Sequence, residues 1–186
     1  MIIPSEYTKV LISEEDMQAR IKEIAAQINR DYKGCTLLVV GILKGAVLFY
    51  SDLVRNLDMD VQFEFMTISS YGNSTDSTGE VKIRKDLDVS INDRHVLIVE
   101  DIIDTGLTLT NLKEVLSTRK PASIKICCML DKPSRRKVDL VPDYCCYEVP
   151  DQFIIGYGLD YAESGRQFRD VCYVLPECIE PLKKST

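Results

Sequence analysis

Three carboxylates and a turn rich in hydroxyl groups follow an aliphatic run in the middle of the chain. Residues 96–99 are all aliphatic, as in a strand covered on both faces, and Glu100 and Asp101 follow them directly. At the carboxyl end of a strand in an open α/β sheet, acids lie where such sheets bind ligands. Two adjacent carboxylates can accept hydrogen bonds from the two hydroxyls of a ribose. The pair therefore predicts a sugar-binding site.

The residues after this acid pair predict that the sugar carries a phosphate. Asp104 separates the pair from a turn that contains Thr105, Gly106, Leu107 and Thr108. Hydroxyls and close backbone N–H groups at the start of a helix bind phosphate. The alternative is an ordinary strand, turn and helix with solvent-facing acids. We favour the ligand site because two carboxylates at a buried strand end repel each other and need a ligand or cation.

Residues 100–106 resemble the phosphoribosyl pyrophosphate (PRPP) motif of the type I phosphoribosyltransferases, in the form of the hypoxanthine-guanine branch. The resemblance implies an α/β fold in which a mainly parallel twisted sheet is flanked by helices. It also implies one domain over residues 1–186, with a small hood built from the N-terminal and C-terminal segments. The implied activity is purine salvage: transfer of the 5-phosphoribosyl group from PRPP to hypoxanthine, guanine or both, with release of pyrophosphate. In that reaction Asp104 takes or shares a purine proton as general base.

A second predicted strand end carries residues that the family uses to bind pyrophosphate. Lys44 and Gly45 match this loop, and the family often has a cis peptide before the lysine, here between Leu43 and Lys44. Arg166 matches an arginine that binds the leaving pyrophosphate. Arg169 takes that place if the loop is aligned differently.

Ser70 and Tyr71 match the start of the family's flexible loop, which closes over the reacting centre. Residues 69–79 are polar and contain glycine, so we expect a mobile loop there. Closure of such a lid excludes water that would compete with the purine.

Lys132 matches a lysine that binds the exocyclic oxygen of a 6-oxopurine in the family. An ammonium group has only donors, so it favours this oxygen over the amino group of adenine. Apart from the resemblance, a solvated lysine that neutralises the neighbouring Asp131 is equally compatible with the sequence. Asp131 itself stands where some relatives have a non-acidic residue.

Further purine contacts are implied in the last quarter of the chain. Phe153 matches an aromatic residue that stacks on the purine, and Ile154 a residue whose backbone meets the base edge. Asp160 matches an acid near the base and a metal. Gln152 departs from relatives that have lysine there.

The resemblance implies Mg²⁺ as the cofactor, since this ion neutralises pyrophosphate and prefers oxygen ligands. The candidate protein ligands are Glu100, Asp101 and Asp160.

Two other functions remain open at this stage. One is a regulatory protein of the same fold that senses PRPP or a nucleotide and binds nucleic acid, and the other is a xanthine-preferring phosphoribosyltransferase. A net charge of −6 and a pI of about 4.9 argue against the first, because broad nucleic-acid binding requires cationic surface. Many relatives form dimers or tetramers, so we expect a homodimer or homotetramer.

Composition is that of an ordinary globular protein, with 45% hydrophobic and 28% charged residues in a chain of 186. We expect a cytoplasmic protein without membrane contact, since no basic start precedes an apolar run of membrane-spanning length.

The seven cysteines lack Cys-x-x-Cys spacing, so reduced and partly buried thiols are expected. The only histidine, His95, is expected to face solvent rather than to catalyse.

The hydrophobic pattern predicts alternating strands and helices that would carry these residues. A helix over 14–31 begins at a Ser13 capping signal. The further expected elements are strands at 36–41, 61–68, 81–83, 96–99, 124–130, 153–156 and 171–174, a helix that ends near residue 53 and a helix over 105–117.

Overall fold

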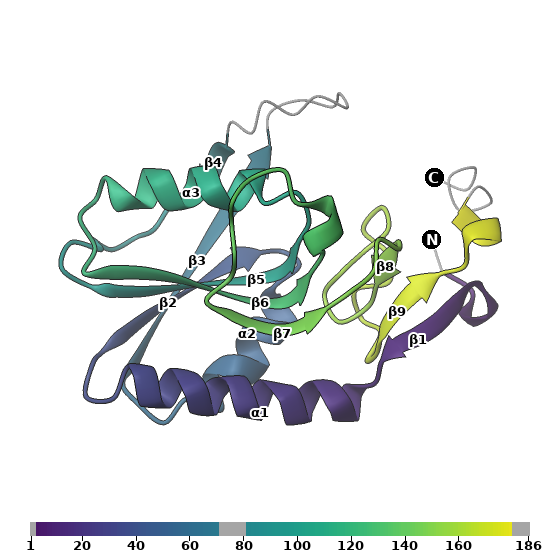
Figure 1. Ribbon diagram of the computed structural model, residues 1–186, viewed down its shortest axis with the longest axis horizontal. Helices are drawn as coiled ribbons and strands as arrows, with labels where there is room; N and C mark the ends of the chain where they lie inside the picture. The colour runs from purple at the N-terminus through teal and green to yellow at the C-terminus, as the bar shows by residue number, and fades with distance from the viewer. Residues whose placement is uncertain (1–2, 71–80, 180–186) are drawn as a thin grey trace.

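The computed structural model describes residues 3–70 and 81–179. They form a six-stranded sheet of order β4-β3-β2-β5-β6-β7 and a three-stranded sheet of order β1-β9-β8 (Figure 1). The strands are β1 Thr8–Ile12, β2 Leu37–Leu43, β3 Val61–Ser70, β4 Val81–Lys85, β5 His95–Ile103, β6 Ser123–Asp131, β7 Tyr144–Glu148, β8 Ile154–Ile155 and β9 Val171–Val174. The helices are α1 Glu14–Asp31, α2 Val47–Val54 and α3 Leu107–Ser117, with 3₁₀ turns η1 Ser5–Tyr7 and η2 Pro133–Arg135.

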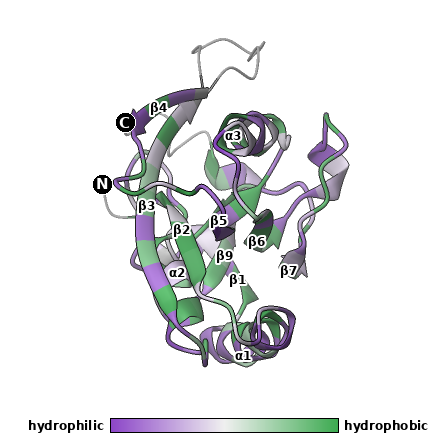
Figure 2. Ribbon diagram, turned by 90° about the vertical axis from the view of Figure 1, so that its left-hand side faces the viewer, coloured by the Kyte–Doolittle hydropathy of each residue, from purple (hydrophilic) through white to green (hydrophobic). Residues whose placement is uncertain are grey.

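Helices cover both faces of the six-stranded sheet. Neighbouring strands from β3 to β7 pair in parallel, and β4 is antiparallel to β3. Figures 1 and 2 show α1 and α2 on one face and α3 on the other. In β2, Leu37 and Val39 pack with α1 and α2, while Leu38 and Val40 pack with α3. Burial on both faces therefore explains why this strand is apolar along its whole length, and the expected α/β fold is confirmed.

The smaller sheet joins segments from opposite parts of the chain. Strand β1, which the sequence pattern did not predict, pairs antiparallel with β9, and β9 pairs with β8. Its sequence mixes charged and apolar residues in only five positions, so it carries little periodic signal. This sheet lies beyond the carboxyl ends of the parallel strands, near both termini (Figure 1).

The first predicted helix is confirmed with its cap. Helix α1 spans Glu14–Asp31, and the Ser13 side chain accepts a hydrogen bond from the Asp16 backbone N–H at 3.2 Å. Its buried residues lie on one face and recur with helical spacing: Met17, Ile21, Ile24, Ala25 and Ile28. The cap and the apolar face together fix this helix against the sheet.

Three predictions required correction. Strand β5 continues through both acids to Ile103, so the acids lie in its last residues rather than beyond it. Helix α3 begins at Leu107 instead of residue 105, because Gly106 has φ +81° and the helix starts after it. His95 is half-buried, with its Nδ1 2.8 Å from Ser123 Oγ, so it does not simply face solvent.

The cysteine prediction is confirmed, since all seven thiols are free and four of them are buried. Among the described residues, no helix combines the length and the apolar character needed to cross a membrane.

Candidate active site

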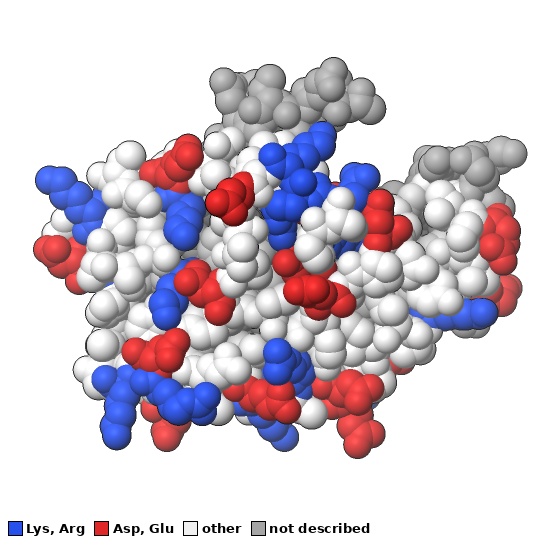
Figure 3. Space-filling view, in the orientation of Figure 1, with Lys and Arg blue, Asp and Glu red and all other residues white. Residues whose placement is uncertain are grey.

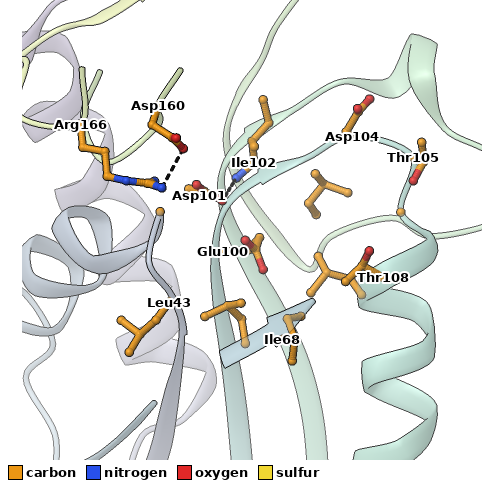
Figure 4. Close-up of a pocket in the computed structure, with 15 residues that line it drawn as sticks. Leu43, Ile68, Glu100, Asp101, Ile102, Asp104, Thr105, Thr108, Asp160 and Arg166 are labelled. Carbon is orange, nitrogen blue, oxygen red and sulfur yellow. Dashed lines mark hydrogen bonds and ion pairs between the residues drawn. The ribbon is translucent and has the colours of Figure 1, made fainter. Parts of the chain in front are cut away.

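A cavity of about 350 Å³ lies at the carboxyl edge of the central sheet, where four separate segments meet (Figure 4). Its walls come from the end of β2 with the loop after it, the end of β3, the continuous stretch from the end of β5 to the start of α3, and the segment between β8 and β9. Parallel strands bring these loops to one edge although they are far apart in the sequence. The lining residues that carry chemistry are Gly45, Glu100, Asp101, Asp104, Thr105, Gly106, Thr108, Asp160 and Arg166.

Glu100 and Asp101 both line this cavity. Loss of solvent around the Glu100 carboxyl raises its pKa well above the ordinary value of a glutamate, and the adjacent Asp101 charge raises it further. Neither acid forms an ion pair within residues 3–70 and 81–179. The Asp101 Oδ1 accepts a hydrogen bond from the Ile102 N–H at 2.8 Å. The pair is therefore short of positive charge.

Gly45 allows the loop after β2 to lie directly against Asp101. A Cβ atom at this position would be 1.6 Å from Asp101 Oδ2, so no other residue fits without a shift of backbone or acid. The peptide between Leu43 and Lys44 just before it is cis, at the bond where the resemblance placed one. This loop thus presents backbone, rather than side chain, to the acid pair.

The turn before α3 has the shape of an anion cradle. Gly106 has φ +81°, a conformation that favours glycine, and a Cβ there would be 2.9 Å from Arg136 Cδ. The Thr105 Oγ1 accepts a hydrogen bond from the Leu107 N–H at 3.4 Å, and Thr108 faces the cavity from the first turn of the helix. Backbone donors and hydroxyls therefore converge at a helix start.

A second cavity, of about 500 Å³, adjoins the first. Both are lined by Ile102, Asp104 and Asp160, so these residues stand between them. The second cavity also contains the residues expected to read a purine: Lys132, Phe153 and Ile154. The structure thus brings the PRPP-motif residues and the predicted purine residues to two sides of Asp104.

Lys132 lies over this second cavity with its side chain only 12% exposed. Its Nζ donates to the Gln152 backbone oxygen at 2.6 Å and is 3.8 Å from Asp151 Oδ1. Asp131 pairs instead with Arg136. The interpretation of Lys132 as a neutralising partner of Asp131 is therefore wrong.

Phe153 and Ile154 form the apolar side of the second cavity. Phe153 is 39% exposed, and its ring packs edge to face with that of Tyr161 at a centroid distance of 5.3 Å, while Ile154 is buried. An exposed aromatic ring held by a neighbour is a suitable stacking surface for a flat heterocycle.

Asp104 is paired with a cation that the sequence reading missed. Its Oδ1 accepts from Arg135 Nε at 3.0 Å, and Arg135 Nη1 is also 3.7 Å from Asp151. The backbone oxygen of Asp104 accepts from Arg136 Nη1 at 2.9 Å. The Arg135-Arg136 pair was visible in the sequence as two adjacent basic residues after Lys132, but nothing in the pattern indicated which acids they would meet.

Arg166, rather than Arg169, reaches the first cavity. Its Nη2 is 2.8 Å from Asp160 Oδ1, and its Nε is buried with no hydrogen-bond partner. Arg169 pairs with Glu14, and its side chain is 82% exposed. Arg166 therefore lines the first cavity, whereas Arg169 does not.

Lys44 is not among the residues that line either cavity, although its neighbours Leu43 and Gly45 line the first one. It meets another acid that the sequence reading missed. Its Nζ is 3.0 Å from Glu163 Oε2, which is also 3.3 Å from Arg166 Nη2. Tyr71 and the side chain of Ser70 lie outside the described residues, so the predicted lid stays a prediction.

A family model described as "Phosphoribosyl transferase domain" matches residues 11–162. Hypoxanthine-guanine phosphoribosyltransferase of Bacillus subtilis is 52% identical over 166 residues, which cover 89% of this chain and 91% of that protein. The chain belongs to the hypoxanthine-guanine phosphoribosyltransferase family. The resemblance drawn from residues 100–106 is thereby confirmed.

Solved structures of the hypoxanthine-guanine phosphoribosyltransferase family have the same fold. One from Bacillus anthracis matches with a TM-score of 0.87 and 48% identity, over 90% of this chain and 98% of that one. A hypoxanthine phosphoribosyl transferase from Trypanosoma cruzi matches with a TM-score of 0.92 and 40% identity, over 99% of this chain and 100% of that one. The structural match therefore covers both sheets of this chain.

Proposed function

We propose that this chain transfers the 5-phosphoribosyl group from PRPP to hypoxanthine and guanine, which forms IMP and GMP and releases pyrophosphate. The observation that carries the proposal is the pair of adjoining cavities with Asp104 between them. One cavity has groups for a sugar phosphate and the other has groups for a 6-oxopurine. Named relatives at 46–52% identity support the same substrates.

The first cavity accounts for the phosphoribosyl group. Glu100 and Asp101 accept hydrogen bonds from the ribose hydroxyls, and the turn of Thr105, Gly106, Leu107 and Thr108 binds the 5-phosphate. The sugar carbon becomes positively charged as its bond to pyrophosphate breaks, as in glycosidic bond cleavage generally. The nearby carboxylates stabilise this charge where it develops.

The pyrophosphate of PRPP lies toward Lys44, Gly45 and Arg166. Gly45 presents backbone at the cavity wall, and Arg166 lines the same cavity with its side chain 26% exposed. An anion that contacts the Arg166 guanidinium and the Lys44 ammonium would place its charge between two cations. These contacts favour departure of pyrophosphate away from the sugar.

Magnesium fits this donor set. Glu100, Asp101 and Asp160 present carboxylate oxygens to one cavity. Residues 3–70 and 81–179 contain no cluster of three or more His, Cys, Asp or Glu side chains positioned to hold a metal by themselves. This agrees with Mg²⁺, which usually takes one or two carboxylates and completes its shell with substrate phosphates and water. Bound there, it neutralises the pyrophosphate charge.

The second cavity accounts for the base. Lys132 donates to the exocyclic oxygen of the purine, Phe153 stacks on the ring, and the Ile154 backbone meets its edge. Asp104 lies between base and sugar, where it accepts the proton that the purine ring nitrogen loses as the new bond forms. Asp160, shared by both cavities, lies near the base and the metal.

Other parts of the assembly follow from the family. We propose that the β1-β9-β8 sheet is the hood over the purine side of the site, and that the segment starting at Ser70 and Tyr71 closes over the reacting centre. The enzyme works in the cytoplasm as a homodimer or homotetramer. Acidic and basic side chains are interspersed on the face in Figure 3, which does not favour nucleic-acid binding by that face.

A base-by-base assay tests the proposal. Purified protein receives PRPP and magnesium with hypoxanthine, guanine, xanthine or adenine, and ultraviolet absorbance follows nucleotide while pyrophosphate release is measured in parallel. We expect nucleotide and equal pyrophosphate from hypoxanthine and guanine. A strong preference for xanthine or adenine would contradict the base assignment, and PRPP binding without product from any base would favour a sensor.

A further inference from the structure

The carboxylate of Glu163 forms ion pairs with the two cations assigned above to pyrophosphate, those of Lys44 and Arg166. Its Oε2 is 3.0 Å from Lys44 Nζ and 3.3 Å from Arg166 Nη2. These cations lie on segments far apart in the chain, and this oxygen atom lies within ion-pair distance of both. An acid that bridges them satisfies the same positive charges that a phosphate oxygen would satisfy.

The position of Glu163 is set by an unusual turn. Tyr161 and Ser164 exchange two backbone hydrogen bonds of 2.9 Å, which closes a two-residue turn over Ala162 and Glu163. Both central residues have positive φ, 47° and 67°, where turns of this kind ordinarily have Asn or Gly. Such a conformation costs free energy in residues with a Cβ and persists where surrounding contacts fix it.

Contacts on both sides hold this turn in place. The Glu163 backbone N–H donates to Asp160 Oδ2 at 2.8 Å, and the Glu163 side chain reaches Lys44 and Arg166. The adjacent Asp160 pairs with the same guanidinium. The turn therefore aims Glu163 toward the cations from the segment that also supplies Asp160 and Arg166.

The Glu163 side chain is free to leave this position. It is 65% exposed, and its partner Lys44 is 67% exposed, so water solvates both groups when they separate. Because the two ion pairs are exposed, an incoming polyanion can displace the carboxylate without burying it.

We propose that Glu163 is an internal competitor of pyrophosphate, a role that rests on the proposed function of this site. In the free enzyme its carboxylate neutralises Lys44 and Arg166. PRPP or pyrophosphate displaces it, and its return to the two cations promotes release of pyrophosphate after transfer. Glu163 thus lowers the affinity of the site for the leaving group.

Two substitutions separate the charge from the turn. Glu163→Gln keeps the length of the side chain and removes its charge. Glu163→Asn also removes the charge, but Asn tolerates the left-handed backbone better than Glu. A matched control is Glu114→Gln, which removes one exposed negative charge from α3, away from the lining of the first cavity.

The experiment is calorimetric titration of each full-length protein with magnesium pyrophosphate, together with the KM for PRPP. We expect both Glu163 variants to bind pyrophosphate about threefold more tightly at low ionic strength, because an exposed pair contributes modestly, and less so in high salt. The KM for PRPP falls in parallel, and Glu114→Gln behaves as the wild type.

Unchanged or weakened pyrophosphate binding in Glu163→Gln would overturn the proposal, and so would a gain limited to Glu163→Asn, which would assign the effect to the turn. Failure of the proposed function gives a different result. In that case the wild type forms no nucleotide with any purine, while the titration still reports whether Glu163 competes with pyrophosphate.

Discussion

The two edges of the central sheet differ in how they neutralise charge. At the amino edge, Tyr144 donates to Asp31 Oδ2 at 2.5 Å and Lys125 Nζ lies 3.3 Å from the same oxygen. At the carboxyl edge, Glu100 and Asp101 have no ion pair among the described residues. One edge carries a charge with its partners in place, and the other carries two adjacent like charges.

This difference shifts the pKa values of Asp31 and Glu100 in opposite directions. The Tyr144 hydroxyl and then Lys125 lower the pKa of Asp31, whereas loss of solvent and the Asp101 charge raise that of Glu100. The contacts of Asp31 at the amino edge therefore stabilise the fold. At the carboxyl edge, Glu100 and Asp101 lower the stability of the free protein and form a binding site whose ligand compensates their charge. Such local conflicts are expected where function requires them. Four substitutions test this comparison.

The largest effect is expected from Asp104→Asn at the carboxyl edge. Asparagine keeps the shape but cannot accept the purine proton, so kcat should fall about 10²- to 10⁴-fold. PRPP affinity should change much less, since other groups bind the sugar phosphate. Steady-state kinetics with hypoxanthine and PRPP measures both quantities. Unchanged turnover would remove Asp104 from the general-base role.

Lys132→Ala should affect the choice of base. Loss of the only donor assigned to the exocyclic oxygen should reduce the kcat/KM ratio of hypoxanthine over adenine by roughly tenfold to a hundredfold. The comparison of kcat/KM for the two bases gives this ratio directly. If the ratio stays the same, Lys132 serves only its contacts with Gln152 and Asp151.

Glu100→Gln should stabilise the protein while it weakens PRPP binding. Because the native pKa of Glu100 is raised, the wild type loses stability as pH rises from the ordinary glutamate value of about 4.3 through the native pKa. The amide carries no charge and avoids this loss. We expect a gain of about 1 kcal/mol at neutral pH, or roughly 2–4 °C in Tm, which shrinks toward pH 4. A lower Tm at neutral pH would contradict the comparison.

Tyr144→Phe should give the smallest effect, and only on stability. Loss of the hydrogen bond to Asp31 should cost about 1 kcal/mol or less without change in kcat. The native pKa of Asp31 is lowered, so this stabilisation is complete above about pH 4 and is lost as pH falls below it. Thermal unfolding at neutral and acid pH should therefore show a difference that narrows in acid. A constant difference would assign the effect to packing instead.

The strong hydrophobic periodicity made most of the main sheet predictable from sequence. Buried parallel strands such as β2 give runs of apolar residues, and α1 has both a cap and an apolar face. Strand β7 escaped prediction because it is an edge strand of tyrosine and cysteine, and β1 because its residues alternate poorly. Edge strands are defined by their partners more than by their own pattern.

The site was predictable where residues are adjacent in the chain and unpredictable where they are brought together. Glu100 to Thr108 form one continuous segment, so their types and order indicated a sugar phosphate site. The pairing of Arg135 with Asp104, and of Glu163 with Lys44, joins residues 31 and 119 positions apart. No local pattern encodes such contacts, and the choice between Arg166 and Arg169 likewise depended on the fold.

The most direct test of the charge comparison is thermal unfolding with and without PRPP and magnesium, applied to the wild type, Glu100→Gln and Tyr144→Phe. A ligand that binds only the native state raises Tm by mass action. The account predicts that Tyr144→Phe starts lower yet gains the same increment as the wild type, whereas Glu100→Gln starts higher and gains clearly less. Equal increments in all three proteins would contradict the claim that ligand compensates the acids at the carboxyl edge.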